Sequence, residues 1–366
     1  MKRKHASFTV IAQNYFGYGI VLADSMRASN PDNDFYIYFA DGISSEVQRL
    51  LDLHDIIGID ATQTVDSKIF LKMATYYEIT EYCTAIKPFI IRQLFEKEYS
   101  TVTYLDPDIY VYSSFNIHIH PKLESNSILI TPHICSPIQD SKLPGEQVHL
   151  KTGTFNLGFI SVKNDPIGNT FCTWWANRCQ TACFNDPFYG LFVDQKWINL
   201  VPGLFEKVYI DRNLGLNVAY WNLHEREIAN NKVNNEHELV FFHFSGFVSN
   251  DINSISKYQN RFTLSSRPDL KPLFEDYKKR VDDIFNSLPT MPGYKYGKLS
   301  NGVQISLVSR RFFYWNIEQL ACPFESPGAE KSLLFAQKEM VFTTRNPTTQ
   351  YPFLRTLTPR QSPSTF

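Results

Sequence analysis

Two acidic residues, Asp106 and Asp108, interrupt an apolar and β-branched run, TVTYLDPDIYVY, at positions 101–112. Pro107 between them cannot donate to a central hydrogen-bond ladder, so we expect the strand to end or bulge there. Two carboxylates at a strand end are costly to bury unpaired, and a divalent cation is a natural neutraliser. Because Mg²⁺ or Mn²⁺ on one or two carboxylates usually completes its shell with substrate phosphates, the pair predicts a site for a nucleoside diphosphate.

The D-x-D spacing alone is weak evidence, and the chain contains its own control. Asp32 and Asp34 have the same spacing, but they follow Asn30 and Pro31 and precede an apolar run. Asn, Pro and Asp in that order are ordinary turn residues. The context of Asp106 and Asp108, and not their spacing, therefore carries the prediction.

The elements around this acidic pair are typical of an α/β protein. Apolar runs at 8–12, 35–41, 154–164, 207–210, 217–221 and 239–246 indicate strands. Helical patterns lie between them, and the helical stretch 67–98 should restart near Lys87, because Pro88 is tolerated only in a first turn. Such alternation builds a mainly parallel central sheet flanked by helices, and ligands bind beyond the carboxyl ends of its strands.

Length, composition and charge exclude several classes. The chain has 366 residues and a formal net charge of −1, so no global field attracts nucleic acid, and we expect no nucleic-acid partner. Six cysteines show no C-x-x-C pair and predict reduced thiols. Without a signal peptide or an apolar span, the chain is expected to be cytoplasmic; peripheral contact at the inner face of a membrane stays open, as does the oligomeric state.

Pattern changes along the chain predict its domain organisation. We expect one large domain over 1–285, an accessory region with a helix and a β-hairpin over 286–345, and a flexible tail over 346–366. The hairpin prediction rests on the Asn301-Gly302 turn signal. The aperiodic segment 131–153 is long enough to be a mobile or functional loop.

Four motifs in order, YLDPDIYVY, FNLGFISV, DQKWINLVP and HFSGF, together resemble the retaining glycosyltransferases of the GT-A fold. The sequence is most similar to family 8, which includes glycogenin and bacterial lipopolysaccharide galactosyltransferases, and to its bacterial YLDPDI subgroup. The resemblance spans 7–260, with NVAYWNL at 217–223 as a further bacterial-type match. It implies metal-dependent transfer of a sugar from a nucleotide-diphosphate sugar, with a UDP-sugar as the first candidate donor. The acceptor would be a glycan, a lipid-linked molecule or a protein, and the anomeric configuration would be retained. The implied setting is bacterial cell-surface polysaccharide biosynthesis.

The resemblance also implies the ligands of the metal. Asp106 and Asp108 would bind Mn²⁺ or Mg²⁺, with His243 of HFSGF as the third ligand. An imidazole beside carboxylates favours Mn²⁺ slightly. The alternative for His243 alone is a hydrogen-bonded histidine at a strand end.

A further set of residues would contact the nucleotide sugar, by the same resemblance. It consists of Ala12, Gln13, Asn14 and Tyr15 at the base and ribose, Lys87 and Asp106 facing the donor, Asn156 at the donor sugar, and Gly246 and Lys257 near the diphosphate. Lys257 departs from the family pattern, because it follows Gly246 later than usual and without a proline. The alternatives are polar loop residues that satisfy backbone groups and, for Lys87, a solvated lysine.

Asp194 and Gln195 match positions beside the donor sugar, and the resemblance makes them the candidates for catalysis. The alternative for Asp194 is the N-cap of the helix that follows. Retention could proceed through a group on the opposite face of the sugar or through attack from the leaving-group side, and the sequence leaves both routes open. An inverting reaction would need a carboxylate base, for which Asp140 and Glu146 are available.

Two other functions remain open at this point. A non-catalytic protein that binds carbohydrate or sugar nucleotides could keep the metal site and lack turnover. A nucleotidyltransferase would share the sheet and the metal carboxylates, but that class usually has a Gly-rich loop after the first strand. IAQNYFGYG, at 11–19, is a poor version of such a loop.

Overall fold

The computed structural model describes residues 5–63, 67–251, 253–299, 301–316 and 322–324. The chain divides into two compact units, Met1–Gly297 and Lys298–Phe366. The predicted boundaries at 285 and 345 stay predictions, and the predicted tail over 346–366 lies outside the described residues.

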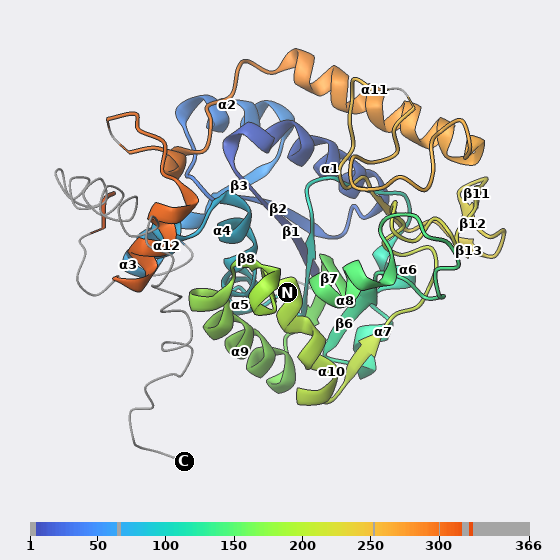
Figure 1. Cartoon of the computed structure of the whole chain (residues 1–366), viewed down its shortest axis with the longest axis horizontal. Coiled ribbons are helices and arrows are strands. Elements are labelled where there is room, and N and C mark those ends of the chain that lie inside the picture. Colours follow the sequence, from blue (N-terminus) through green and yellow to red (C-terminus); the bar gives the residue numbers. More distant parts are fainter. Residues whose placement is uncertain (1–4, 64–66, 252, 300, 317–321, 325–366) are drawn as a thin grey trace. The chain divides into compact units, whose positions relative to one another are not determined.

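A seven-stranded sheet forms the centre of the first unit, in the order β10-β6-β7-β4-β1-β2-β3 (Figure 1). Its strands are β1 (His5–Ile11), β2 (Asp34–Phe39), β3 (Ile57–Asp60), β4 (Thr101–Leu105), β6 (Ile128–Pro132), β7 (Phe155–Lys163) and β10 (Val208–Ile210). Neighbours pair in parallel except that β7 is antiparallel to both β4 and β6. The predicted α/β class with a mainly parallel central sheet is confirmed.

Helices cover both faces of this sheet. They are α1 (Phe16–Ser29), α2 (Ser45–His54), α3 (Ser67–Tyr76), α4 (Ile79–Ala85), α5 (Lys87–Glu96), α6 (Phe115–His118), α7 (Lys122–Ser125), α8 (Glu146–Thr152), α9 (Pro166–Ala182), α10 (Val201–Leu204) and α11 (Lys271–Ser287). Strand β2 shows the two faces: Ile37 and Phe39 pack with α1 and α2, whereas the Tyr38 hydroxyl donates to Gln93 of α5. Alternate residues of a strand point to opposite faces, so β2 is buried on both.

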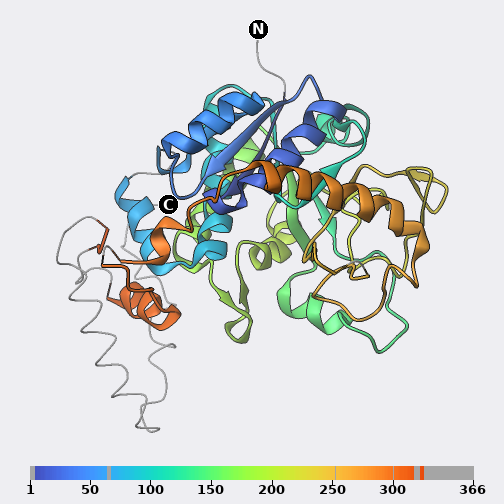
Figure 2. The ribbon, with the colours of Figure 1, turned by 90° about the horizontal axis from the view of Figure 1, so that it is seen from above.

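Helix α11 lies along α1 (Figure 2). Gly17 of α1 allows this approach, because a Cβ there would lie 2.6 Å from the Phe285 ring. The same ring meets Tyr18 edge-on, with the centroids 5.1 Å apart. On this side, Phe274, Tyr277 and Val281 of α11 belong to the same buried apolar cluster as Val21 of α1.

Local signals explain where several elements begin and end. The Ser44 hydroxyl accepts from the Val47 amide and caps α2. Asn30 ends α1, and Pro88 lies in the first turn of α5, as its missing N–H requires. Strand β4 ends at Leu105, immediately before the acidic pair. The start of α5 and the end of β4 agree with the sequence predictions.

One local prediction was wrong. The run 217–221 is not a strand: Asn217 takes a left-handed φ of 52°, and Val218 makes only an isolated bridge to Phe242. The predicted functional role of the segment 131–153 stays a prediction, but the segment has more regular structure than its sequence indicated. It contains α8, and Arg261 binds the Asp140 carboxylate and the carbonyls of Lys142 and Pro144.

The second unit contains α12 (Leu307–Trp315), capped by the Ser306 hydroxyl, which accepts from the Ser309 amide. Of the predicted hairpin at Asn301-Gly302, the residues that the structure describes form one antiparallel bridge, between Lys298 and Gln304. Gly302 has a φ of +82°, which only glycine adopts freely. Among the described residues of both units, no helix has the length and apolar character needed to cross a bilayer.

Candidate functional site

A small two-stranded sheet brings the candidate metal ligands together. After β4 the chain turns at Asp106, whose carbonyl accepts from the Ile109 amide at 3.1 Å, and continues as β5 (Ile109–Val111). Strand β14 (Phe241–His243) pairs antiparallel with β5 and places His243 opposite Ile109. The amide of Phe244 donates to the Asp108 carbonyl at 2.8 Å. This register carries His243 to the acidic pair.

The side chains of Asp106, Asp108 and His243 converge, with one ligand atom from each lying within 4.8 Å of the others. His243 Nε2 is 2.9 Å from Asp108 Oδ1 and 3.6 Å from Asp106 Oδ2. His243 is 3% exposed on its side chain, whereas the two carboxylates are 29% and 27% exposed. Two oxygen ligands and one imidazole nitrogen, open to solvent on one side, fit Mn²⁺ or Mg²⁺ that completes its shell with phosphate oxygens.

Lys87 lies directly behind the acidic pair and is 1% exposed, so the solvated-lysine alternative was wrong. Its Nζ is 3.0 Å from Asp194 Oδ2 and 3.8 Å from Asp106 Oδ1, and it donates to the Leu157 carbonyl at 2.9 Å. Burial acts to lower the pKa of Lys87, but the carboxylates of Asp194 and Asp106 outweigh it and raise that pKa. Lys87 is therefore a charged ammonium inside the protein.

Asp194 is the buried partner of this ammonium. Burial raises the pKa of Asp194 to about 6, and Lys87 opposes that shift. Asp194 precedes the 3₁₀ helix Gln195–Leu200, but its side chain makes no capping bond, so the N-cap alternative was wrong. The carboxylate turns instead to Lys87, which links Asp194 to the metal ligands.

Two side-chain amides, those of Asn156 on β7 and of Gln195, lie near the three candidate metal ligands. Asn156 Oδ1 accepts from the Gly158 amide and from Asn217 Nδ2, both at 3.0 Å. Gln195 Oε1 accepts from the Leu157 amide at 3.0 Å, and its Nε2 donates to the Thr152 carbonyl. Asn156 and Gln195 thus hold the chain beside His243.

The segment after β1 lies at the same end of the sheet. Its residues are Ala12, Gln13, Asn14 and Tyr15, of which the first two are buried and the last two exposed. The Gln13 amide donates to Asp41 Oδ1 at 3.1 Å, and the Ser44 hydroxyl donates to Gln13 Oε1 at 2.8 Å. Burial raises the pKa of Asp41 to about 6. Asp41 therefore holds the Gln13 backbone in place. The sequence analysis did not select Asp41, although it is the last residue of the apolar run 35–41.

Tyr15 and Lys257 mark the open side of the site. Burial of its ring, followed by the Asp108 carboxylate, raises the pKa of Tyr15, and Lys257 opposes that shift. The Lys257 amide donates to the Gly246 carbonyl at 3.0 Å, and Lys257 is exposed. Gly246 has a φ of +71° and contacts Ser256 too closely for a Cβ. The glycine turn therefore lets the chain come back so that the Lys257 backbone pairs with Gly246.

Further residues of the site escaped the sequence analysis. The Tyr104 hydroxyl donates to Asp106 Oδ1 at 2.6 Å, and Lys87 Nζ lies 4.0 Å from the Tyr104 ring centroid. A strand tyrosine two residues before the motif, on the same face, was the available signal. Of the two carboxylates considered for an inverting reaction, Asp140 binds Arg261 and Glu146 accepts from the Ile138 amide.

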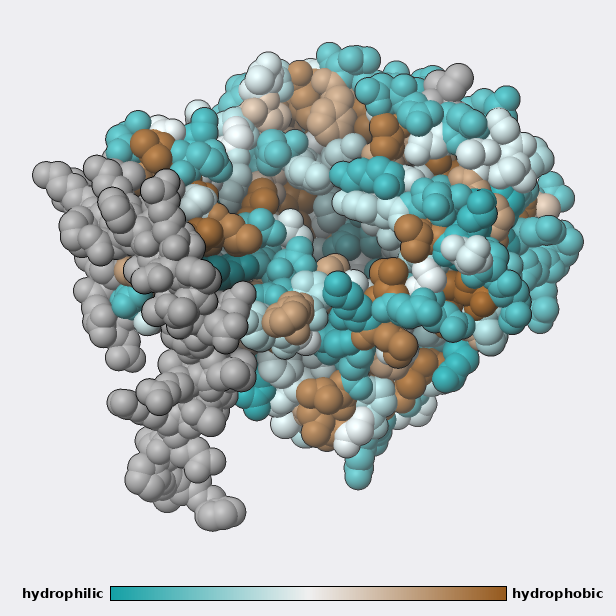
Figure 3. All heavy atoms as spheres, viewed as in Figure 1, coloured by the Kyte–Doolittle hydropathy of each residue, from teal (hydrophilic) through white to brown (hydrophobic). Residues whose placement is uncertain are grey.

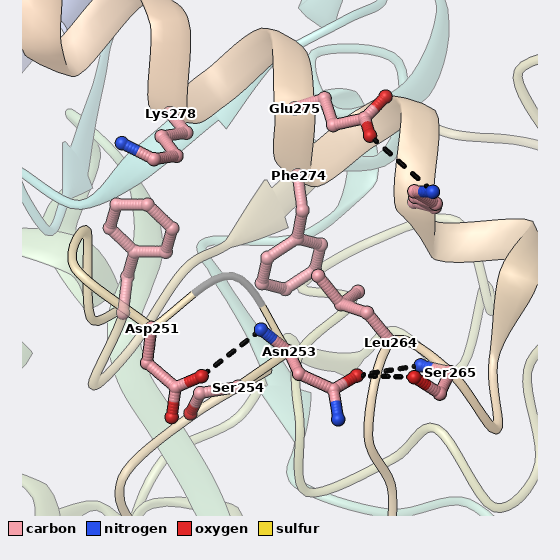
Figure 4. Close-up of a pocket in the computed structure, with 10 residues that line it drawn as sticks. Asp251, Asn253, Ser254, Leu264, Ser265, Phe274, Glu275 and Lys278 are labelled. Atoms are coloured by element: carbon pink, nitrogen blue, oxygen red, sulfur yellow. Dashed lines mark hydrogen bonds and ion pairs between the residues drawn. The ribbon is translucent and has the colours of Figure 1, made fainter.

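A separate cavity of about 380 Å³ lies between α11 and the segment 247–265 (Figure 4). Phe274 and Leu264 form part of its wall. Asp251 accepts from the Asn253 amide, and Asn253 accepts from the amide and hydroxyl of Ser265. No residue predicted for the site is among the described residues that line this cavity.

Gly158 should be essential for the position of His243, because a Cβ at Gly158 would lie 2.3 Å from His243 Cε1. We expect Gly158→Ala to displace the imidazole and to weaken Mn²⁺ binding by at least about 10-fold, as misplaced ligand geometry does. Titration calorimetry with Mn²⁺ checks this. Gly203→Ala is the matched control, because a Cβ added at Gly203 would have no neighbouring atom within 4 Å. Equal Mn²⁺ affinity in the two variants would contradict the arrangement.

Metal affinity should depend on pH through His243. Burial acts to lower its pKa, but Asp108 and Asp106 outweigh this and raise it in the metal-free protein. The ion pair with the imidazolium stabilises the metal-free fold below the ordinary histidine pKa, and this stabilisation is lost as pH rises through the raised pKa. A metal needs the neutral ring, so we expect Mn²⁺ affinity to fall by up to about 10-fold per pH unit below that pKa.

Calorimetry in buffers of different ionisation enthalpy measures the protons released on Mn²⁺ binding. Near neutral pH we expect release of a substantial fraction of one proton in the unmodified protein and close to none in His243→Asn. Proton release that is the same in both proteins would show that His243 does not bind the metal.

The sequence is similar to two curated proteins. No protein-family model matches the chain. Two curated Bacillus subtilis (strain 168) proteins are similar: YfnF is 24% identical over 77% of this chain and 93% of its own length, and YfnD is 21% identical over 77% and 91%. Both are described as uncharacterized.

Several solved structures of glycosyltransferases are also similar. GlyE of Streptococcus pneumoniae TIGR4 gives a TM-score of 0.46 at 12% identity and covers 81% of this chain and 66% of its own. The galactosyltransferase LgtC gives 0.41 at 16% identity, over 78% and 97%. Mouse xyloside xylosyltransferase 1 gives 0.41 at 11% identity, over 66% and 97%. These scores are all below 0.5.

Proposed function

We propose that the protein is a metal-dependent glycosyltransferase that uses a nucleotide-diphosphate sugar, with UDP as the first candidate nucleotide. The observation that carries this proposal is the convergence of Asp106, Asp108 and His243 at the carboxyl end of β4. A site with two carboxylates and one imidazole, open on one side, suits a cation that is shared with a diphosphate. The ordered motifs at 104–112, 155–162, 194–202 and 243–247 support the same proposal.

In this proposal Asp106, Asp108 and His243 hold Mn²⁺ or Mg²⁺. The bound ion supplies Lewis-acid stabilisation of the charge that develops on the departing nucleoside diphosphate. Tyr104 orients the Asp106 carboxylate through its 2.6 Å hydrogen bond. Lys87 provides a buried positive charge behind that carboxylate.

Asp194 and Gln195 are proposed to act at the transferred sugar, with Asn156. The bonds from Gln195 to the backbone of Leu157 and Thr152 fix the strand that faces the sugar. The Asp194 carboxylate, stabilised by Lys87, can support positive charge at the anomeric carbon. We propose retention of configuration, and both retaining routes remain open.

The rest of the assignment follows from the motifs. We propose that Ala12, Gln13, Asn14 and Tyr15 bind the base and ribose, and that Lys257 and the Gly246 turn approach the diphosphate. A glycan, lipid-linked or protein molecule is the proposed acceptor. Bacterial cell-surface polysaccharide biosynthesis in the cytoplasm, at the inner face of the membrane, is the proposed setting.

A panel of nucleotide sugars tests the proposal. We expect Mn²⁺-dependent binding and slow hydrolysis of at least one UDP-sugar, and NMR of the first product gives the configuration of the released sugar. Binding without turnover, with or without acceptor sugars, would favour the non-catalytic alternative. If the folded protein binds no nucleotide sugar in Mn²⁺, the proposal is wrong.

A further inference from the structure

Beside the metal triad lies a second group of buried side chains, His133, His149 and Trp221. The ring centroids of His133 and His149 are 4.9 Å apart, and those of His133 and Trp221 are 5.3 Å apart. Trp221 in turn meets the ring of His243 edge-on, with the centroids 5.2 Å apart. The group is therefore continuous with the proposed metal site. Figure 3 shows that the face drawn there is hollowed near its middle, with hydrophilic residues in the recess.

Each member of this group has a buried nitrogen without a hydrogen-bond partner among the described residues: Nδ1 of His133, Nε2 of His149 and Nε1 of Trp221. The three residues are 5%, 7% and 3% exposed. Buried polar atoms are nearly always paired, and an unpaired one is destabilising. Three of them in one contiguous group indicate a site whose partners come from a ligand.

The network around His133 fixes which of its nitrogens carries the proton. Asn156 Oδ1 accepts two hydrogen bonds, so the Asn156 amide must donate to His133 Nε2, at 3.2 Å. His133 Nε2 is then an acceptor, and its Nδ1 carries the hydrogen. His133 and Trp221 thus both present unused N–H donors.

The group is uncharged at neutral pH. Burial lowers the pKa of His133 to about 3 and the neighbouring His149 lowers it further, whereas the nearby backbone carbonyls of Thr154 and Gly153 oppose that shift. Burial also lowers the pKa of His149 to about 4; His224 and Arg261 act in the same direction, and Glu146 opposes them. Neutral N–H donors and ring nitrogens suit hydroxyl groups, whereas these three side chains offer no charge of their own to a carboxylate or phosphate.

We propose that His133, His149 and Trp221 form a subsite that binds the hydroxyl groups of an uncharged sugar and selects it against acidic sugars. This inference rests on the proposed function. The sugar could be the one carried by the nucleotide or the acceptor, since either would lie beside the metal. The three are positioning residues, because none is placed at the reacting atoms.

Two conservative variants test the subsite, His149→Phe and Trp221→Phe. Each keeps an aromatic ring in place and removes the nitrogen that would bind a hydroxyl. His133 is left unchanged, because it also accepts from Asn156. The matched control is His120→Phe. His120 is likewise buried, with an unpartnered Nε2 and a pKa lowered to about 3 by burial, but it stacks on His5 at the amino end of β1.

Two measurements distinguish the sources of the sugar. Calorimetry in Mn²⁺ compares UDP with the UDP-hexose that the panel identifies, and transfer assays use methyl hexosides as acceptors. If the nucleotide-borne sugar occupies the subsite, UDP affinity stays within about twofold while UDP-hexose affinity falls about 3- to 10-fold, the worth of one neutral hydrogen bond. If the acceptor occupies it, both affinities are retained and the KM for the methyl hexoside rises by the same factor.

Unchanged UDP-hexose affinity and unchanged acceptor KM in both variants, relative to His120→Phe, would overturn the subsite while leaving the proposed function intact. An unmodified protein that binds no UDP in Mn²⁺ would contradict the proposed function itself. Comparing UDP-hexose with UDP-hexuronic acid checks the charge argument. If the nucleotide-borne sugar occupies the subsite, we expect the unmodified protein to prefer the hexose at least about 10-fold; if the acceptor occupies it, we expect the same preference in KM for a methyl hexoside over a methyl hexuronide. No preference for the uncharged sugar in either comparison would contradict the selection against acidic sugars.

Discussion

Replacing Asp106 and Asp108 together by asparagine should abolish Mn²⁺-dependent binding of UDP and lower any transferase activity by at least about 1,000-fold. Both carboxylates lie within reach of His243 and of one cation, and an amide oxygen carries no charge to hold it. Removing one preorganised electrostatic contact typically costs about 100- to 1,000-fold in kcat, and this variant removes two. Calorimetry with UDP in Mn²⁺, followed by turnover of the UDP-sugar, measures the loss.

The fold should survive this change, because both carboxylates are about a quarter exposed. Asp32→Asn together with Asp34→Asn is the control, since it alters the other D-x-D triplet, which runs from the turn before β2 into its first residue. We expect that variant to keep UDP binding, although Asp34 loses part of its bond from Tyr99. Mn²⁺-dependent UDP binding that persists in the Asp106 and Asp108 variant would remove the basis of the proposed site.

Lys87→Met should lower the free energy of unfolding by about 3–5 kcal/mol, because it leaves the Asp194 carboxylate buried without its partner. The two side chains are 2% and 1% exposed, so solvent cannot replace the lost charge. The pKa of Asp194, already about 6, should rise further without Lys87. A raised carboxylate pKa makes ionisation in the folded state costly. The loss in free energy of unfolding should therefore grow as pH rises through that pKa and become smaller in acid. Urea unfolding at about pH 5 and about pH 8 measures it.

A second change separates the lost charge pair from lost packing. Lys87→Met combined with Asp194→Asn should recover at least half of the deficit at about pH 8, because no buried charge remains. Lys279→Met is the surface control: Lys279 and Asp283 are 75% and 62% exposed, and such pairs contribute at most about 1 kcal/mol. A deficit in Lys87→Met no larger than in this control, and independent of pH, would show that the buried pair does not stabilise the fold.

Much of the architecture follows from local sequence chemistry. Pro88 can stand only in the first turn of a helix, and α5 begins at Lys87. Pro107 cannot donate to a ladder, and β4 ends before it. Alternating strand and helix patterns predicted the mainly parallel sheet. These signals depend on neighbours along the chain, so a single sequence contains them. The strand prediction for 217–221 was wrong because the β-branched and aromatic residues of this run pack in a turn instead of a hydrogen-bonded ladder.

The sequence by itself determined that two carboxylates stand at a strand end, and the motifs named His243 as their partner. Only the tertiary structure decided that β14 pairs with β5 in the register that places His243 opposite Ile109. It also decided that Lys87 is buried against Asp194, and that His133, His149 and Trp221 meet beside the triad with unpaired nitrogens. Each of these contacts joins residues far apart in the chain. Burial and strand register are properties of packing, and local residue patterns do not encode them.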